Sequence, residues 1–260
     1  MIKMKTRTLK GEKPMTQKEK YALEWNNSAQ FFYDHNSYKH LSDQIRKYKT
    51  VLEIGCGTGQ STLALLEAGH AVIAVDQNPY CIVKAKQLIE EFGYTITEDI
   101  TKISPRTVCF IECDVTDMSF EQNILPNISP DIVICWNIGS YWDKAKLNDA
   151  VPKMIEYGLT PEQISANTES SYGELVFWRT CAIAKAKNCA VHLVDRGMQK
   201  ITRFNDPYYV LLKKEFSFKK IKYVNTKATT LSKGGRQLIS NGKVNTQNEM
   251  PIIFISILMA

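Results

Sequence analysis

The chain has 260 residues, of which 44% are hydrophobic and 23% charged, and these shares exclude a largely disordered or fibrous protein. A chain of this length can fold as one large α/β domain without disulfide bonds or a structural metal. No hydrophobic run reaches the ~18–20 residues of a membrane-spanning helix, and the basic N-terminus lacks the apolar region of a secretory signal. The seven cysteines lie mostly in apolar runs without Cys-x-x-Cys spacing, which predicts a cytoplasmic protein with reduced thiols and no membrane partner.

Positive charge is concentrated in two stretches of the chain. The net charge is +6, from 33 basic and 27 acidic residues. Residues 1–20 carry seven Lys or Arg against two Glu, and residues 213–243 carry nine against Glu215 alone. Such stretches attract polyanions when they share one face, but neither contains a nucleic-acid motif. We interpret residues 1–15 as a basic flexible tail, and we expect the later stretch on a solvated face, away from the carboxyl ends of the first two strands.

Two helices are expected before the first strand. Thr16 and Glu19 form a capping-box pattern, which satisfies free backbone amides at a helix start. Apolar residues then recur at helical spacing in two segments, with Tyr21, Trp25, Ala29 and Phe32 in the first and Tyr38, Leu41, Ile45 and Tyr48 in the second. Residues 16–48 are therefore predicted to form a helical unit of their own.

From residue 49 onward, the pattern alternates between strand and helix. Residues 71–75 form a continuous apolar run, as in a strand covered on both faces. Gly69 ends one predicted helix, and Asn78-Pro79 begins another. The predicted strands are 51–54, 71–75, 107–112, 131–136, 189–194, 220–230 and 251–259, and the main predicted helices are 61–68, one after 79, a small one from 160 and one at 171–187. This order predicts a doubly wound, mainly parallel sheet in one α/β domain over residues 49–260.

The glycine-rich loop Gly55-Cys-Gly-Thr-Gly59 is the strongest sign of a ligand site. It joins a predicted strand directly to a predicted helix. Glycine allows a ligand to approach the backbone, and the helix start offers free amides and the positive end of the helix dipole. In open α/β sheets, ligands bind at this edge.

The spacing of the loop argues against a dinucleotide. Dinucleotide sites use G-x-G-x-x-G, whereas here Gln60 stands where the third glycine would fall and Gly59 comes one residue early. Glu53 adds a carboxylate in the strand before the loop, which is a poor neighbour for pyrophosphate. These residues favour a cationic or zwitterionic ligand, such as a nucleoside with an amino-acid tail and a sulfonium.

The pattern Glu53-x-Gly55-x-Gly57-x-Gly59, followed by Val75-Asp76, resembles the class I S-adenosylmethionine-dependent methyltransferases. The resemblance covers about residues 48–260 by strand order, and its motifs lie between Val51 and Asn137. It implies a Rossmann-like fold with seven strands in the order 3-2-1-4-5-7-6, the last two forming an antiparallel hairpin, and a helical lid formed by residues 16–48. It also implies S-adenosyl-L-methionine as cofactor and S-adenosyl-L-homocysteine as product.

The resemblance also implies which residues bind the cofactor. In this family the acid that ends strand 2 binds both ribose hydroxyls, a role that falls to Asp76, and one carboxylate can accept two such donors. The acid after strand 3 commonly accepts the adenine amino group, which implies Asp114, although Asp114 also suits a turn or a helix cap. The predicted cofactor-binding residues are Trp25, Glu53, Gly55, Cys56, Gly57, Gly59, Asp76, Gln77, Asp114, Val115, Trp136 and Asn137.

In the same family, residues after the fourth strand line the acceptor pocket. Asn137 suits hydrogen bonds to the cofactor or the acceptor, and Trp136, Tyr141 and Trp142 suit the pocket wall, with core packing as the alternative for the tryptophans and the tyrosine. The tetrapeptide of amino-methylating DNA enzymes and the Pro-Cys pair of cytosine-C5 enzymes are absent here, which argues against DNA bases. The candidate catalytic residues are Asn137, Tyr141, Asp143 and His192.

Other polar residues carry weaker predictions. His192 lies in the middle of a predicted strand, where a structural role competes with that of a base. Asp195-Arg196-Gly197 ends the same strand near the ligand edge and is a candidate for contact with the acceptor. Cys109 and Cys113 have no histidine partners, so no metal site is predicted.

Methyl transfer from a sulfonium is an in-line displacement, for which positioning matters most. Well-oriented reactants reach effective molarities of ~10⁵–10⁸ M, so a dedicated base is optional. The resemblance therefore implies a methyltransferase, and we expect it to act on a small-molecule acceptor, with the first helix covering the cofactor. Two alternatives remain open, namely an RNA or protein methyltransferase that uses the basic stretches, and a non-methylating nucleoside-binding relative.

Overall fold

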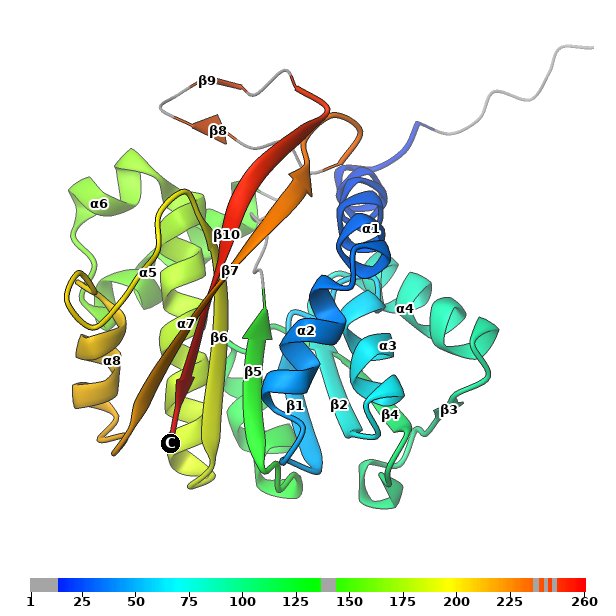
Figure 1. The fold of residues 1–260 in the computed structure, drawn as a ribbon. Coiled ribbons are helices and arrows are strands. Elements are labelled where there is room, and N and C mark those ends of the chain that lie inside the picture. Colours follow the sequence, from blue (N-terminus) through cyan, green and yellow to red (C-terminus); the bar gives the residue numbers. More distant parts are fainter. Residues whose placement is uncertain (1–13, 137–143, 236–238, 241–242, 245–246) are drawn as a thin grey trace, which may run out of the picture.

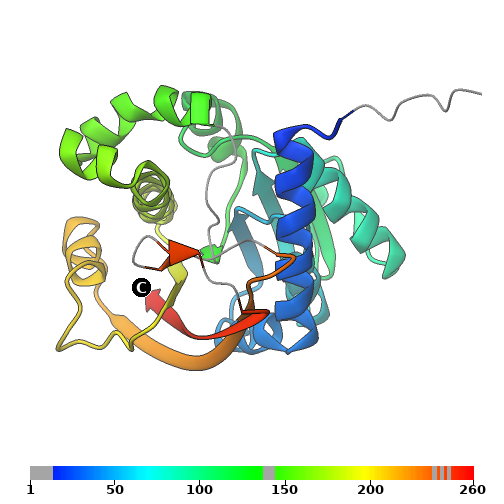
Figure 2. The same cartoon turned by 90° about the horizontal axis from the view of Figure 1, so that it is seen from above.

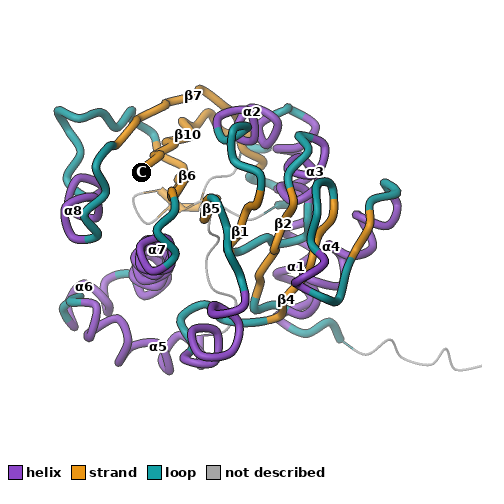
Figure 3. Tube along the Cα trace, turned by 90° about the horizontal axis from the view of Figure 1, so that it is seen from below, coloured by secondary structure: helices purple, strands orange, loops and turns teal. Residues whose placement is uncertain are grey.

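The computed structural model describes residues 14–136, 144–235, 239–240, 243–244 and 247–260. Within them, an eight-stranded sheet lies between two groups of helices (Figure 1 and, from below, Figure 3). The helices within residues 17–91 cover one face of the sheet, and the helices within residues 144–215 cover the other. The predicted doubly wound α/β fold is confirmed.

The elements follow the predicted alternation closely. The strands are β1 (Thr50–Ile54), β2 (Ala71–Asp76), β3 (Thr95–Ile96), β4 (Thr107–Glu112), β5 (Ile132–Trp136), β6 (Ala190–Gly197), β7 (Ile221–Leu231), β8 (Ile239–Ser240), β9 (Lys243–Val244) and β10 (Glu249–Met259). The α-helices are α1 (Gln17–Asp34), α2 (Ser37–Gln44), α3 (Gln60–Glu67), α4 (Pro79–Glu91), α5 (Lys144–Tyr157), α6 (Pro161–Ala166), α7 (Thr168–Ala186) and α8 (Tyr209–Glu215). None of the helices among the described residues is long and apolar enough to cross a membrane.

The strand count differs from the prediction, while the predicted order is confirmed. The sheet order is β3-β4-β2-β1-β5-β6-β10-β7, so the sheet has eight strands rather than seven. The additional strand, β3, has two residues and pairs with β4 at the edge. Hydrophobic periodicity cannot reveal so short a strand. The other seven follow the order 3-2-1-4-5-7-6, and β10 runs antiparallel to both β6 and β7.

Alternation of side chains along each strand builds two separate cores. Leu52 and Ile54 of β1 face the cluster under α5–α8, whereas Val51 faces the cluster under α1–α4. Glu53 shares the face of Val51, so its carboxylate points toward α3 and not toward the other helices. This placement follows from the two-residue period of a strand.

The N-terminal helices pack on the same face as α3 and α4. The capping box predicted at Thr16 is present, because the Glu19 amide donates to the Thr16 hydroxyl and the Thr16 amide donates to the Glu19 carboxylate. Trp25, Ala29 and Phe32 of α1 are buried. Figure 2 shows α1 lying across the edge where the parallel strands end.

The connection that follows β7 returns to α1. Because β10 is antiparallel to both of its neighbours, β7 runs in the direction of β6 and also ends at the ligand edge. The side-chain amide of Asn27 donates to the Gly234 carbonyl at 2.7 Å. Much of the later basic stretch lies on β7 and the connection after it, and exposed Lys233 precedes Gly234 in the part of this connection that contacts α1.

Candidate functional site

The glycine loop ends β1 at the carboxyl edge of the sheet and is held in a tight conformation. Gly57 and Gly59 have φ values of 55° and 95°, which residues other than glycine rarely adopt. A Cβ atom on Gly59 would lie 2.9 Å from the Cα of Ala85, so α4 packs directly against the loop. Glycine is therefore required here by the backbone and by the neighbouring helix.

Asp76 ends β2 and faces the loop, as the sequence predicts. Its Oδ2 accepts the Gly57 amide at 2.9 Å, and its Oδ1 accepts the Asn78 amide at 2.8 Å. Burial raises the pKa of Asp76 to about 6, against the lowering effect of these amide donors. The side chain is half-buried, so its carboxylate can still accept donors from outside.

Glu53 is fully buried and is paired within the protein. The hydroxyls of Ser61 and Thr62, in the first turn of α3, donate to its two carboxylate oxygens at 2.5 and 2.6 Å. Burial raises the pKa of Glu53 to about 7 even though these hydroxyl donors lower it. In the structure, Glu53 ties α3 to β1.

Helix α1 covers the glycine loop with an indole. A Cβ atom on Gly57 would lie 2.1 Å from Nε1 of Trp25, so the ring rests on the Gly57 backbone. The Arg196 guanidinium carbon lies 5.7 Å from the centre of the Trp25 ring, within the range of a cation–π contact. Arg196 belongs to the end of β6, so the indole joins the loop after β1 to the end of β6.

Polar side chains bind α1 to the same edge. The buried Gln60 amide donates to the side-chain oxygens of Asn26 at 3.2 Å and Gln30 at 3.5 Å. The side-chain amide of Asn78 donates to the Lys18 backbone carbonyl at 3.2 Å. The helix is therefore fixed to both the β1–α3 loop and the β2–α4 loop.

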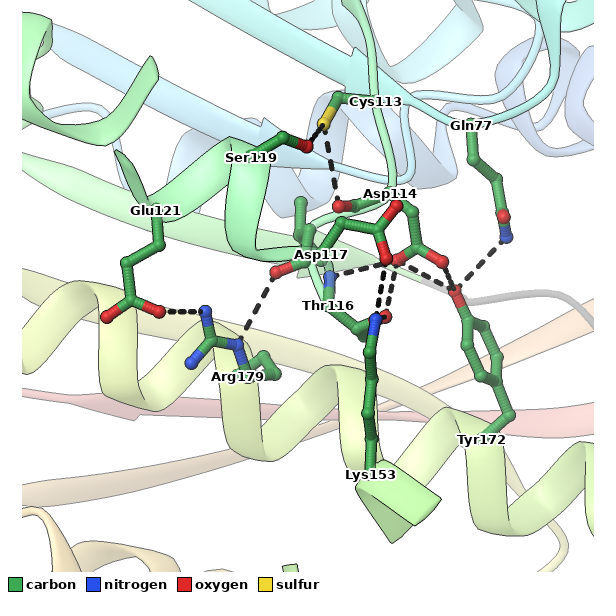
Figure 4. Close-up of polar contacts among 11 residues, drawn as sticks. Gln77, Cys113, Asp114, Thr116, Asp117, Ser119, Glu121, Lys153, Tyr172 and Arg179 are labelled. Carbon is green, nitrogen blue, oxygen red and sulfur yellow. Dashed lines mark hydrogen bonds and ion pairs between the residues drawn. The ribbon is translucent and has the colours of Figure 1, made fainter. Parts of the chain in front are cut away.

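A second polar cluster surrounds Asp114, which follows β4 (Figure 4). Oδ1 of Asp114 accepts the Thr116 amide at 2.9 Å and the Thr116 hydroxyl at 2.8 Å. The Tyr172 phenol of α7 donates to both oxygens of Asp114 at 3.3 Å and accepts the Gln77 amide at 3.1 Å. Lys153 of α5 donates to Asp117 at 2.6 Å in the same cluster.

The remaining predicted cofactor residues take varied positions. Gly55 and Cys56 both donate their amides to the Val75 carbonyl, at 2.8 and 3.1 Å, which closes the loop against β2. Val115 is buried in the core under α5–α8, and its carbonyl accepts the Arg179 side chain at 3.4 Å.

Trp136 and His192 form a buried pair on β5 and β6. The Trp136 indole donates to Nδ1 of His192 at 3.0 Å, and the two rings meet edge to face. Nδ1 must then be the unprotonated nitrogen, which places the proton on Nε2. Burial lowers the pKa of His192 to about 3, so the ring stays neutral. Among the described residues, the contact of His192 is with the Trp136 ring, and it joins β5 to β6.

Several predicted residues lie outside the described residues, namely Asn137, Tyr141, Trp142 and Asp143, as does most of the basic tail. Within the described ranges, no group of three or more His, Cys, Asp or Glu side chains could hold a metal ion. Sequence reasoning missed Tyr172 as a site residue. It lies 58 positions from Asp114, and no local pattern marks it.

Known proteins share both the motif region and the fold. Residues 51–157 match a family model described as a methyltransferase domain. The sequence is 31% identical over 99 residues to the ribosomal RNA small subunit methyltransferase A of Novosphingobium aromaticivorans, a match that covers 37% of this chain and 34% of that protein. The chain therefore spans about a third (34%) of the length of this curated relative.

A solved structure resembles nearly the whole chain. The crystal structure of a putative RNA methyltransferase from Pyrococcus horikoshii has a TM-score of 0.50 and 14% sequence identity, and the match covers 95% of this chain and 98% of that one. At this identity the similarity concerns the fold.

Proposed function

The chain belongs to the class I S-adenosylmethionine-dependent methyltransferases, and from this premise we propose that it methylates a small-molecule acceptor held beneath helix α1. S-adenosyl-L-methionine is the cofactor of this class. The proposal concerns the acceptor and the roles of the residues around it.

The residues at the carboxyl edge of the sheet fit an adenosyl ligand. The backbone amides of Gly57 and Asn78 bind separate oxygens of Asp76, and since a carboxylate oxygen can accept a further hydrogen bond, two ribose hydroxyls suit it. Oδ2 of Asp114 takes one phenol donor and can accept an amino group. Gly57 lies against the Trp25 indole of α1 and Gly59 lies against Ala85 of α4, so the loop is enclosed between these two helices.

When bound, S-adenosyl-L-methionine supplies a methyl group already activated on a sulfonium. The chain itself supplies orientation and the exclusion of water. Asp76 and Asp114 would fix the two ends of the nucleoside, and Trp25 would shield the loop from solvent. Arg196, which lies beside the Trp25 ring at the end of β6, would lie near the acceptor and would favour an acceptor with an anionic group.

The contact between Trp25 and Gly57 is the observation that carries the small-acceptor proposal. An indole that rests on the loop leaves no open approach to the Gly57 backbone from that side. The polar contacts of Gln60 and Asn78 with α1 hold this cover in place. A large acceptor would have to displace the helix and break these contacts.

Two experiments test the proposal. Calorimetry should give micromolar or tighter binding of S-adenosyl-L-homocysteine, about −8 kcal/mol or better, and no comparable heat for NAD. Methyl-labelled cofactor should then be incubated with a low-mass cell filtrate and, separately, with bulk RNA. Label in the low-mass products alone supports the proposal, whereas binding of NAD without S-adenosyl-L-homocysteine contradicts it.

An RNA acceptor is the second candidate. Both relatives described above are named RNA methyltransferases. Basic side chains also follow the ends of β6 and β7, where Arg203 lies 4.5 Å from the centre of the Phe204 ring and exposed Lys233 precedes Gly234, whose carbonyl accepts Asn27 of α1. Phe204 is 83% exposed, and exposed aromatic rings beside Arg suit unpaired bases.

Salt dependence separates the two acceptors. The affinity for single-stranded RNA falls as the salt concentration rises. In a plot of log affinity against log salt concentration, each phosphate contact contributes a slope of about −0.7. Weak RNA binding at 50 mM salt that vanishes at 200 mM, with no label on the RNA, is expected from the first proposal. Submicromolar binding at 200 mM together with labelled RNA would favour the second.

A further inference from the structure

Tyr172 is the residue of the Asp114 cluster whose role the family resemblance does not assign. We infer that Tyr172 is a positioning residue that makes the site prefer a purine with an exocyclic amino group over one with a carbonyl at the same position. This inference rests on the proposed function, because it assumes that Asp114 faces the base of an adenosyl ligand.

The donors around Asp114 are divided unequally between its two oxygens. Oδ1 accepts the amide and the hydroxyl of Thr116 and also the Tyr172 phenol. Oδ2 accepts only the phenol among the described residues, at 3.3 Å. Three donors fill Oδ1, so Oδ2 is the oxygen with room for a donor from a ligand.

The phenol fixes the direction of this free acceptor. Tyr172 is 5% exposed, and its ring is packed in the core under α7. Its hydroxyl bridges both carboxylate oxygens while accepting the Gln77 amide at 3.1 Å, so the phenol proton is directed to Asp114. Together with the two donors of Thr116, whose contacts Figure 4 draws, the phenol should restrict rotation of the carboxylate.

A fixed carboxylate discriminates between the two kinds of purine. An ionised carboxylate only accepts hydrogen bonds, so it pairs with an amino group and repels a carbonyl oxygen. The discrimination depends on orientation, because a carboxylate that is free to turn can move away from the carbonyl. Loss of the phenol hydroxyl should therefore weaken binding of the amino ligand and leave the carbonyl ligand unchanged.

The test measures the binding of S-adenosyl-L-homocysteine and of its inosyl analogue, in which a carbonyl replaces the amino group, by calorimetry. Tyr172→Phe should weaken the adenosyl ligand about fivefold to tenfold and leave the inosyl ligand within about twofold, because the bond it removes is long and orients the carboxylate without touching the ligand. Thr116→Val, which removes another donor to Oδ1, should likewise reduce the preference for the adenosyl ligand over the inosyl ligand. Thermal unfolding of each variant checks that it is folded.

A matched control is available in the same chain. Tyr223 donates to Asp206 at 2.6 Å in another tyrosine–aspartate pair, so Tyr223→Phe removes the same kind of bond elsewhere and should change neither ligand. In an Asp114→Asn background, Tyr172→Phe should have no further effect on the preference.

Three outcomes would overturn the inference. Equal weakening of both ligands by Tyr172→Phe would indicate a purely structural role. Tighter binding of the adenosyl ligand would mean that the phenol competes with the base for Asp114. A protein that binds both ligands and is insensitive to Tyr172→Phe would also contradict the role of the phenol. If the unchanged protein binds neither ligand, the proposed function itself fails, and that result is distinguishable from the other three.

Discussion

Glu53→Gln is the variant whose effect can be worked out most fully from the structure. The side chain is 1% exposed, and its carboxylate accepts the hydroxyls of Ser61 and Thr62. Glutamine has nearly the same shape, and its amide can accept one hydroxyl and donate to the other. The variant therefore removes the ionisable group while it keeps the packing between β1 and α3.

The effect on stability follows from the raised pKa. The pKa of Glu53 is about 7 in the folded protein, against an ordinary value of 4.5. Between these values the unfolded chain has lost the proton that the folded protein keeps, so folding stability falls as the pH rises. Over the interval from 4.5 to about 7, at about 1.4 kcal/mol for each pH unit, the loss is about 3 kcal/mol.

Urea unfolding of both proteins from pH 4.5 to 8 measures this difference. The free energy of unfolding of the Glu53 protein should fall by about 3 kcal/mol relative to Glu53→Gln across the range, mostly below pH 7. Glu91→Gln, at an exposed position at the end of α4, should give a curve parallel to that of the unchanged protein. Parallel curves for Glu53→Gln would refute the reasoning, because they would mean that burial does not raise this pKa.

Three further predictions concern the site and its support. Asp76→Asn should weaken S-adenosyl-L-homocysteine binding at least tenfold. In calorimetry, the affinity of the unchanged protein for this ligand should rise as the pH rises through about 6, where Asp76 ionises. An affinity independent of pH would contradict the assignment of Asp76 to the ribose. Gly59→Ala should lower the free energy of unfolding by about 1–3 kcal/mol in urea, because of its φ of 95° and its contact with Ala85, and a neutral result would show that α4 can move. His192→Leu should cost about 1–3 kcal/mol in urea by leaving the Trp136 indole without its acceptor. The cost should be equal at pH 5.5 and 8, because the pKa of His192 is about 3, and a pH-dependent cost would contradict this neutral state.

The sequence by itself determined the features that depend on local spacing. The run from Val51 to Gly59 encodes a buried strand, a turn that only glycine adopts and a helix start, so the loop and its position at the strand end follow directly. The alternation of strands and helices likewise determined the seven main strands. Their order in the sheet followed from the resemblance to the methyltransferase family. Asp76 could be placed at the loop because the carboxyl ends of adjacent parallel strands share one edge.

Only the tertiary structure decided which side chains meet across the chain. Glu53 is a residue of the glycine motif, but its partners are the hydroxyls of α3 because the two-residue period of β1 turns it to that face. Trp25 rests on Gly57, Tyr172 holds Asp114 from 58 positions away, and Asn27 binds Gly234 from 207 positions away. No spacing rule specifies such contacts, because they depend on how whole helices dock onto the sheet, and that docking is set by the combined packing of many side chains rather than by any one segment.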